Sequence, residues 1–137
     1  MNYQLSQDSE SSLNTLHTAL LLGSMSIILL LYTMSDKSSH AFSIDLNAFF
    51  LIGLGVGIAT PSVGILLSTK QMDDIQKSDD LDTVEVKIRT AHIIKWAMIE
   101  SGALINSLFF FMNGNYVHLA LAVMLVLVLG AQRYRAV

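Results

Sequence analysis

The chain has 137 residues, of which 53% are apolar and only 14% are charged, and its formal net charge is −3. A soluble domain typically has about a quarter of its residues charged, so this composition predicts a membrane protein, and the length predicts a single domain. The absence of cysteine excludes disulfides, thiolate metal sites and cysteine nucleophiles, and the absence of a basic block argues against a nucleic-acid partner.

Four apolar segments follow one another along the chain, with polar segments between them. Residues 1–12 are polar and serine-rich, which predicts a short N-terminal tail, and residues 68–89 predict a polar loop. The apolar segments are residues 13–34, 46–67, 90–112 and 116–131. We interpret each as a helix that crosses the ~30 Å hydrocarbon layer. We therefore predict an all-α integral membrane protein, in which residues 13–135 form one four-helix bundle made of two helical hairpins.

The basic residues predict the orientation of the bundle. With four spans, both termini and the loop 68–89 lie on one side of the membrane, and the connection after the first span lies on the other. The first side holds Lys70, Lys77, Lys87, Arg89, Arg133 and Arg135, whereas the other side holds only Lys37. Basic residues concentrate on the cytoplasmic side of membrane proteins. We therefore expect the protein in the bacterial inner membrane, with both termini in the cytoplasm.

The third apolar segment contains a carboxylate near its middle. Glu100 follows Arg89 by ~16 Å along a helix, which places it close to the centre of the hydrocarbon layer. A charged side chain at that depth costs at least ~2.5 kcal/mol. We therefore expect the protein to shield Glu100 and the carboxyl to be neutral.

Small residues on two segments predict how Glu100 is shielded. The second segment carries a stripe of small residues that begins at Gly53, and such a stripe lets another helix approach closely. Small residues also surround Glu100, so we expect the two surfaces to pack together, although the glycines also fit ordinary packing without a further function. The predicted helix-packing residues are Gly53, Gly57, Gly64, Ala97, Ala103 and Ser107. Asn106 lies on another side of the same helix, where we expect it to hydrogen-bond across an interface.

The second segment also contains the only proline of the chain. Pro61 lacks the N–H group that would bond to the carbonyl of Gly57, so that carbonyl is free. The hydroxyls of Thr60 and Ser62 stand beside it. A carbonyl and two hydroxyls are suitable partners for a cation or for a protonated carboxyl, so we include Thr60 and Ser62 with Glu100 in a candidate ion site.

The remaining polar residues predict no catalytic centre. His17, His40, His92 and His118 lie at or just inside the ends of the spans, and we interpret them as interfacial residues rather than ligands. Trp96 is interpreted in the same way, as an anchor at the membrane surface. No metal-ligand spacing and no paired nucleophile and base are present, so the sequence predicts no metal site, no cofactor and no enzyme activity.

Residues 50–112 contain a glycine-rich helix, a polar loop and a helix with a central carboxylate. The motifs are GLGVGIAT (residues 53–60), Val63-Gly64, Lys87-Ile88-Arg89 and Ile99-Glu100-Ser101. This arrangement resembles the proteolipid (c) subunit of rotary F- and V-type ATPases, in which the carboxylate binds and releases a proton or sodium ion as a ring of hairpins turns. The resemblance implies that Glu100 binds the ion, that Ser101 assists as in sodium-binding members, and that the chain forms a homo-oligomer. The Arg-Gln-Pro loop signature of that family is absent.

Two functions are open at this point. In the first, an oligomeric membrane protein binds or translocates H⁺ or Na⁺ through Glu100. In the second, the chain is a non-catalytic structural or accessory subunit that contacts lipid and other membrane subunits, and Glu100 only hydrogen-bonds across a helix interface. Replacing Glu100 with glutamine separates them, because only the first function requires a group that can be ionised.

Overall fold

The computed structural model describes all residues except 1–4, 37, 39, 45, 76–78 and 134–137. Its helices are α1 (Gln7–Met34), α2 (Ala48–Asp73), α3 (Leu81–Asn113) and α4 (Tyr116–Ala131). This confirms the all-α fold, because the secondary-structure elements of the described chain are all helices. The first residues of the predicted tail, and Lys77 and Arg135 of the orientation argument, lie outside the described residues.

The helix boundaries follow from local sequence. A side chain with an oxygen acceptor stands before each helix and accepts a backbone N–H of the first turn; these N-cap residues are Ser6, Asn47, Asp80 and Asn115. Helix α3 ends at Gly114, whose φ of 66° is accessible to glycine at little cost. Capping therefore sets where the helices start, independently of how they pack.

In the described part of the chain, three helices are long and apolar enough to cross a membrane: α1 with 28 residues, α2 with 26 and α3 with 33. The fourth apolar segment forms α4 with the predicted bounds, but its 16 residues extend over only ~24 Å, less than the hydrocarbon layer. The helix lengths thus fit a multi-pass membrane protein, and α4 differs from its three neighbours.

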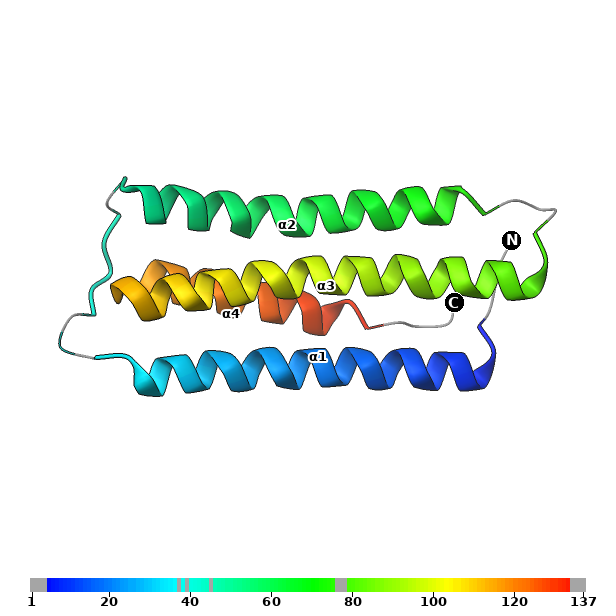
Figure 1. Ribbon diagram of the computed structural model, residues 1–137, viewed down its shortest axis with the longest axis horizontal. Coiled ribbons are helices and arrows are strands. Elements are labelled where there is room, and N and C mark those ends of the chain that lie inside the picture. The colour runs from blue at the N-terminus through cyan, green and yellow to red at the C-terminus, as the bar shows by residue number, and fades with distance from the viewer. Residues whose placement is uncertain (1–4, 37, 39, 45, 76–78, 134–137) are drawn as a thin grey trace.

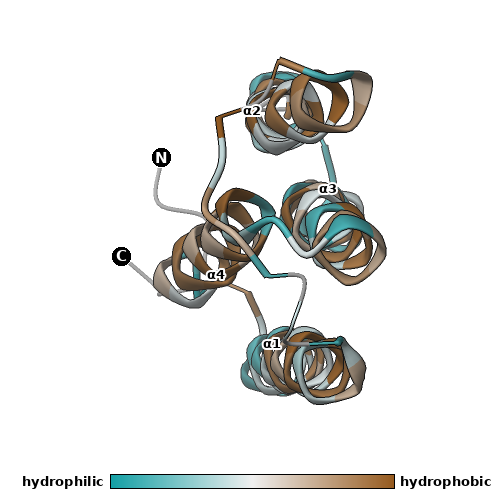
Figure 2. Ribbon diagram, turned by 90° about the vertical axis from the view of Figure 1, so that its left-hand side faces the viewer, coloured by the Kyte–Doolittle hydropathy of each residue, from teal (hydrophilic) through white to brown (hydrophobic). Residues whose placement is uncertain are grey.

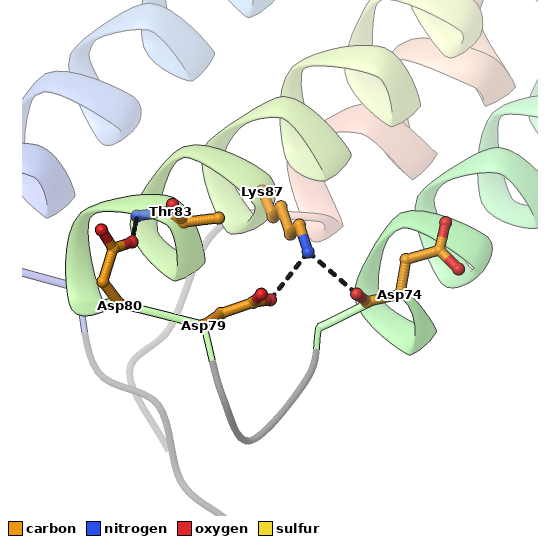
Figure 3. Close-up of polar contacts among 5 residues, drawn as sticks. All are labelled: Asp74, Asp79, Asp80, Thr83 and Lys87. Carbon is orange, nitrogen blue, oxygen red and sulfur yellow. Dashed lines mark hydrogen bonds and ion pairs between the residues drawn. The ribbon is translucent and has the colours of Figure 1, made fainter.

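The connection between α2 and α3 is shorter than the predicted loop 68–89. Helix α2 continues to Asp73 and α3 begins at Leu81, because the polar residues at both ends of this stretch include good helix formers. Figure 3 shows how the two helix ends are tied together. Lys87 Nζ lies 2.7 Å from Asp79 Oδ2 and donates to the Asp74 carbonyl at 2.9 Å.

Helices α3 and α4 lie side by side in the centre of the molecule, with α2 on one side of the pair and α1 on the other (Figure 2). The α3–α4 hairpin is as predicted, whereas α1 and α2 do not pack on each other as a hairpin. The connection between them instead crosses the end of the central pair. Ala41 N–H donates to the Gly114 carbonyl at 3.1 Å, and Tyr116 N–H donates to the Ala41 carbonyl at 3.0 Å. These bonds hold the connection across the α3–α4 turn.

The helices alternate in direction. The start of α1, the end of α2 and the start of α3 lie at one end of the bundle, and α4 runs toward the same end (Figure 1). The opposite end holds the α3–α4 turn and the α1–α2 connection.

Candidate functional site

Glu100 lies near the middle of α3 and is half-buried where α3 contacts α1. Its Oε1 is 3.1 Å from Ser24 Oγ of α1. Ser24 is fully buried, and its hydroxyl also donates to the Leu20 carbonyl at 2.8 Å. A serine hydroxyl has one proton, which Ser24 can donate either to the Leu20 carbonyl or to the Glu100 carboxylate. If the Glu100 carboxyl is protonated, it can instead donate to Ser24 Oγ while Ser24 donates to Leu20.

The glycine stripe of α2 faces a different side of α3 from Glu100, which corrects our expectation. A Cβ added to Gly64 would lie 2.8 Å from Met98 Cβ and 3.2 Å from the Lys95 carbonyl oxygen, so α2 approaches α3 there. Glu100 follows Lys95 by five residues, or about 140° around the helix. The rotation of α3 that brings Lys95 and Met98 to α2 therefore turns Glu100 toward α1.

The other hydroxyls of the predicted ion site bond to their own helices. Thr60 Oγ1 and Ser62 Oγ each donate to the carbonyl four residues earlier in α2, at 2.9 and 2.7 Å. Ser101 Oγ donates to the carbonyl three residues earlier in α3, at 2.8 Å. Neither hydroxyl of α2 bonds to the Gly57 carbonyl that Pro61 frees. Among the described residues, no group of three or more His, Cys, Asp or Glu could hold a metal ion.

Five of the six predicted helix-packing residues are buried. The buried ones are Gly53, Gly57, Gly64, Ala103 and Ser107. Ala97 is exposed, so it does not take part in packing within the chain. Gly53 and Gly64 lie at close contacts of α2 with its neighbours, where an added Cβ would overlap other atoms.

A second polar cluster is fully buried between α2, α3 and α4. Asn106 Nδ2 donates to the carbonyls of Gly53, at 3.1 Å, and Gly102, at 3.0 Å, as expected for a residue that bonds across an interface. His118 Nδ1 lies 3.2 Å from Asn106 Oδ1. Both side chains are 0% exposed, so the interpretation of His118 as an interfacial residue was wrong. Its sequence position near a helix end gave no sign of this, because burial depends on the rotation of α4.

Two further side chains contact backbone carbonyl oxygens at the C-terminal end of α4. His17 Nε2 of α1 lies 2.8 Å from the Leu129 carbonyl oxygen, and Trp96 Nε1 of α3 donates to the Gln132 carbonyl at 2.9 Å. The two rings pack with centroids 4.7 Å apart. The last carbonyls of a helix lack intrahelical partners, and apolar surroundings provide none. Trp96 is 0% exposed, so it is a buried donor and not the surface anchor that we predicted.

No protein-family model matches the chain, and no curated protein or solved structure matches it. The lengths and apolar composition of α1, α2 and α3 are those of a small multi-pass helical membrane protein. The resemblance of residues 50–112 to the proteolipid subunit stays a prediction.

Proposed function

We propose that this integral membrane protein takes up and releases a proton at Glu100, where α1 meets α3. The contact between Glu100 and Ser24 supports the proposal, because it joins two helices near their middles and fits a protonated carboxyl. A neutral carboxyl with a hydrogen-bond partner can be placed inside a membrane at much lower cost than a carboxylate. The same group becomes charged when the proton leaves, so proton release changes the α1–α3 contact.

A proton suits this site better than a metal cation. Hard cations that have lost their water require several oxygen ligands. Near Glu100, the recorded oxygen partner is Ser24, while the hydroxyls of Thr60, Ser62 and Ser101 are used within their own helices. One carboxyl and one hydroxyl are sufficient for a proton.

The charge distribution supports an orientation for this site. Lys70, Lys87 and Arg89 lie near the end of the bundle where α2 ends and α3 begins. We place that end in the cytoplasm of a bacterial cell, because basic residues concentrate on the cytoplasmic side. In this orientation α4 is a fourth crossing. It is a short helix, and His17 and Trp96 contact the backbone carbonyls at its C-terminal end.

Carbodiimide labelling tests whether Glu100 is protonated. Dicyclohexylcarbodiimide reacts with protonated carboxyls in apolar surroundings, and mass spectrometry locates the product. We expect label on Glu100 in the wild-type protein, and none at this position in Glu100→Gln. Asp36 and Asp82 are exposed and serve as internal controls that stay unlabelled. If Glu100 stays unlabelled from about pH 5 to pH 8, the proposal is wrong.

A structural subunit is the second candidate, because the Ser24–Glu100 hydrogen bond also holds α1 on α3 without any proton transfer. Proton flux separates the two functions. The protein is reconstituted in vesicles that contain a pH-sensitive dye, and acid is added outside. We expect the wild type to acidify the lumen faster than Glu100→Gln. Equal rates, with intact labelling of the wild type, would assign Glu100 a structural function within a homo-oligomer or a larger membrane complex.

A further inference from the structure

Asn106 fixes the tautomer of His118. Its amide nitrogen donates two hydrogen bonds, to the carbonyls of Gly53 and Gly102, so its two protons are used. The amide oxygen that faces His118 Nδ1 can only accept. Nδ1 must therefore carry a proton and donate it to Asn106. In the neutral imidazole, the lone pair is then on Nε2.

His118 Nε2 is buried and has no hydrogen-bond partner within the described part of the chain. Buried polar atoms in native proteins are nearly always paired, and an exception calls for an explanation such as a bound water or ion or a chemical function. Here the unpaired atom is the basic nitrogen of an imidazole, a group that can bind a proton. The geometry therefore presents a free base inside the bundle.

The space for this base is created by a glycine. A Cβ on Gly53 would overlap the His118 ring and lie 2.9 Å from Asn106 Oδ1. The aromatic rings beside the imidazole are Phe50 of α2 and Phe109 of α3, with centroid distances of 6.4 and 5.6 Å. None of these neighbours, from α2 or from α3, can titrate. On α4 itself, the nearby Tyr116 bonds to His40 instead.

The cluster is separate from Glu100. Asn106 follows Glu100 by six residues, which is ~9 Å along α3 and about 120° around it. Glu100 faces Ser24 of α1, whereas Asn106 faces α2 and α4. His118 is also only three residues after Asn115, so it lies ~4.5 Å along α4 from the end of the bundle.

We propose that His118 is a second proton-binding site, independent of Glu100, in which Asn106 holds Nδ1–H and Nε2 binds the proton. The proton comes from water at the nearby end of the bundle and returns there, and the ring alternates between imidazole and imidazolium. One feature stabilises the cation: the Nδ1–H bond to Asn106 strengthens when the donor is charged.

Nitrogen NMR of the histidine-labelled protein in a lipid bilayer tests this site, because protonated and unprotonated ring nitrogens have well-separated shifts. The signal of His118 is the one lost in His118→Gln. We expect it to show the Nδ1–H tautomer at neutral pH, and both nitrogens protonated when the pH is lowered. An Nε2–H tautomer at neutral pH, or no protonation between about pH 8 and pH 4.5, would overturn the proposal.

Two variants test the parts of the proposal separately. Asn106→Leu keeps the size of the side chain but removes the acceptor, so we expect the His118 signal to become a mixture of both tautomers; an unchanged tautomer would show that Asn106 does not position the ring. Glu100→Gln should leave the midpoint of the His118 titration unchanged, and a shifted midpoint would refute independence. Because the readout is the His118 signal, failure of the Glu100 proposal leaves this test intact.

Discussion

The two outer helices are attached to the central α3–α4 pair in different ways. The buried residues of α1 are Ser9, Leu13, His17 and Ser24, whereas those of α2 are Phe50, Gly53, Gly57, Gly64 and Ser68. Lipid chains are as apolar as the side chains of a helix, so helices in a membrane associate through hydrogen bonds and close packing rather than through the hydrophobic effect. Helix α1 is held mainly by hydrogen bonds, and α2 mainly by close packing.

Polar contacts hold α1 at three levels. Near its start, Ser9 donates to Glu85 of α3; His17 contacts the end of α4; and Ser24 meets Glu100. Hydrogen bonds between membrane helices contribute about 0.6 kcal/mol on average. An apolar groove of about 480 Å³ also separates parts of α1 and α4, with Leu21 and Val123 among its lining residues. The attachment of α1 therefore depends on a few polar contacts, each of which includes a side chain that can be ionised: Glu85, His17 or Glu100.

Close packing holds α2. Gly64 lies against the backbone of α3 at Lys95, and Gly53 lies against Asn106 and His118. The atoms nearest to Gly64 belong to the Lys95 backbone and to Met98 Cβ, which cannot move aside as the end of a long side chain can. If Glu100 takes up a proton as proposed, the change of charge acts on the contact with α1, because Glu100 meets Ser24 of that helix.

The largest effect is expected from filling the glycine contact of α2. In Gly64→Ala, the new Cβ would lie 2.8 Å from Met98 Cβ and 3.2 Å from the Lys95 carbonyl oxygen, neither of which can rotate away. We expect a loss of stability near the upper end of about 1–3 kcal/mol, measured by denaturant unfolding in detergent. Gly55→Ala and Gly23→Ala are matched controls, because their Cβ atoms would meet nothing within 4 Å. Equal stability of all three variants would refute the close contact.

Removing a donor at the end of α4 should have an intermediate effect. Trp96→Phe keeps most of the ring but leaves the Gln132 carbonyl without the indole N–H. An unpaired buried carbonyl costs about 1–3 kcal/mol, and we expect the lower part of this range because Gln132 is half-buried and water can partly replace the donor. Faster amide exchange confined to the last turn of α4 would locate the effect. Unchanged exchange there would show that Trp96 does not complete this helix end.

Ser24→Ala should weaken the attachment of α1 by a smaller amount. The variant removes the partner of Glu100, and we expect a cost of about 0.6 kcal/mol, with ~1.7 kcal/mol as the upper limit. Ser26→Ala is the matched control, since Ser26 is an exposed serine of the same helix. Carbodiimide should also label Glu100 faster in Ser24→Ala. A labelling rate identical to that of the wild type would contradict the contact.

The smallest effect is expected at the turn that precedes α3, on the side of the molecule that holds α2. Hydrogen bonds from the Thr83 hydroxyl and amide lower the pKa of Asp80 below its ordinary value of 3.8 (Figure 3). A lowered pKa in the folded state stabilises the fold above the ordinary pKa, and this contribution is lost as the pH falls through the lowered pKa. We expect faster amide exchange in the first turn of α3 at acid pH. Asp80→Asn should remove this pH dependence, because asparagine keeps the cap without titrating.

The sequence by itself determined the helices of this protein. Runs of apolar residues and local caps such as Asn47, Asn115 and Gly114 act within a few positions of the chain, so the bounds of α4 and the end of α3 could be read from the residues nearby. The sequence also predicted that Asn106 hydrogen-bonds across a helix interface, which its bond to the Gly53 carbonyl confirms.

Only the tertiary structure decided which faces meet. The rotation of each helix is set by contacts between residues far apart in the chain, and hydropathy does not distinguish the sides of a helix that is apolar all round. The contact of α3 with α2 turned Glu100 away from the glycines and toward Ser24. The same packing buried His118 and Trp96, which their positions near span ends had placed at the membrane surface.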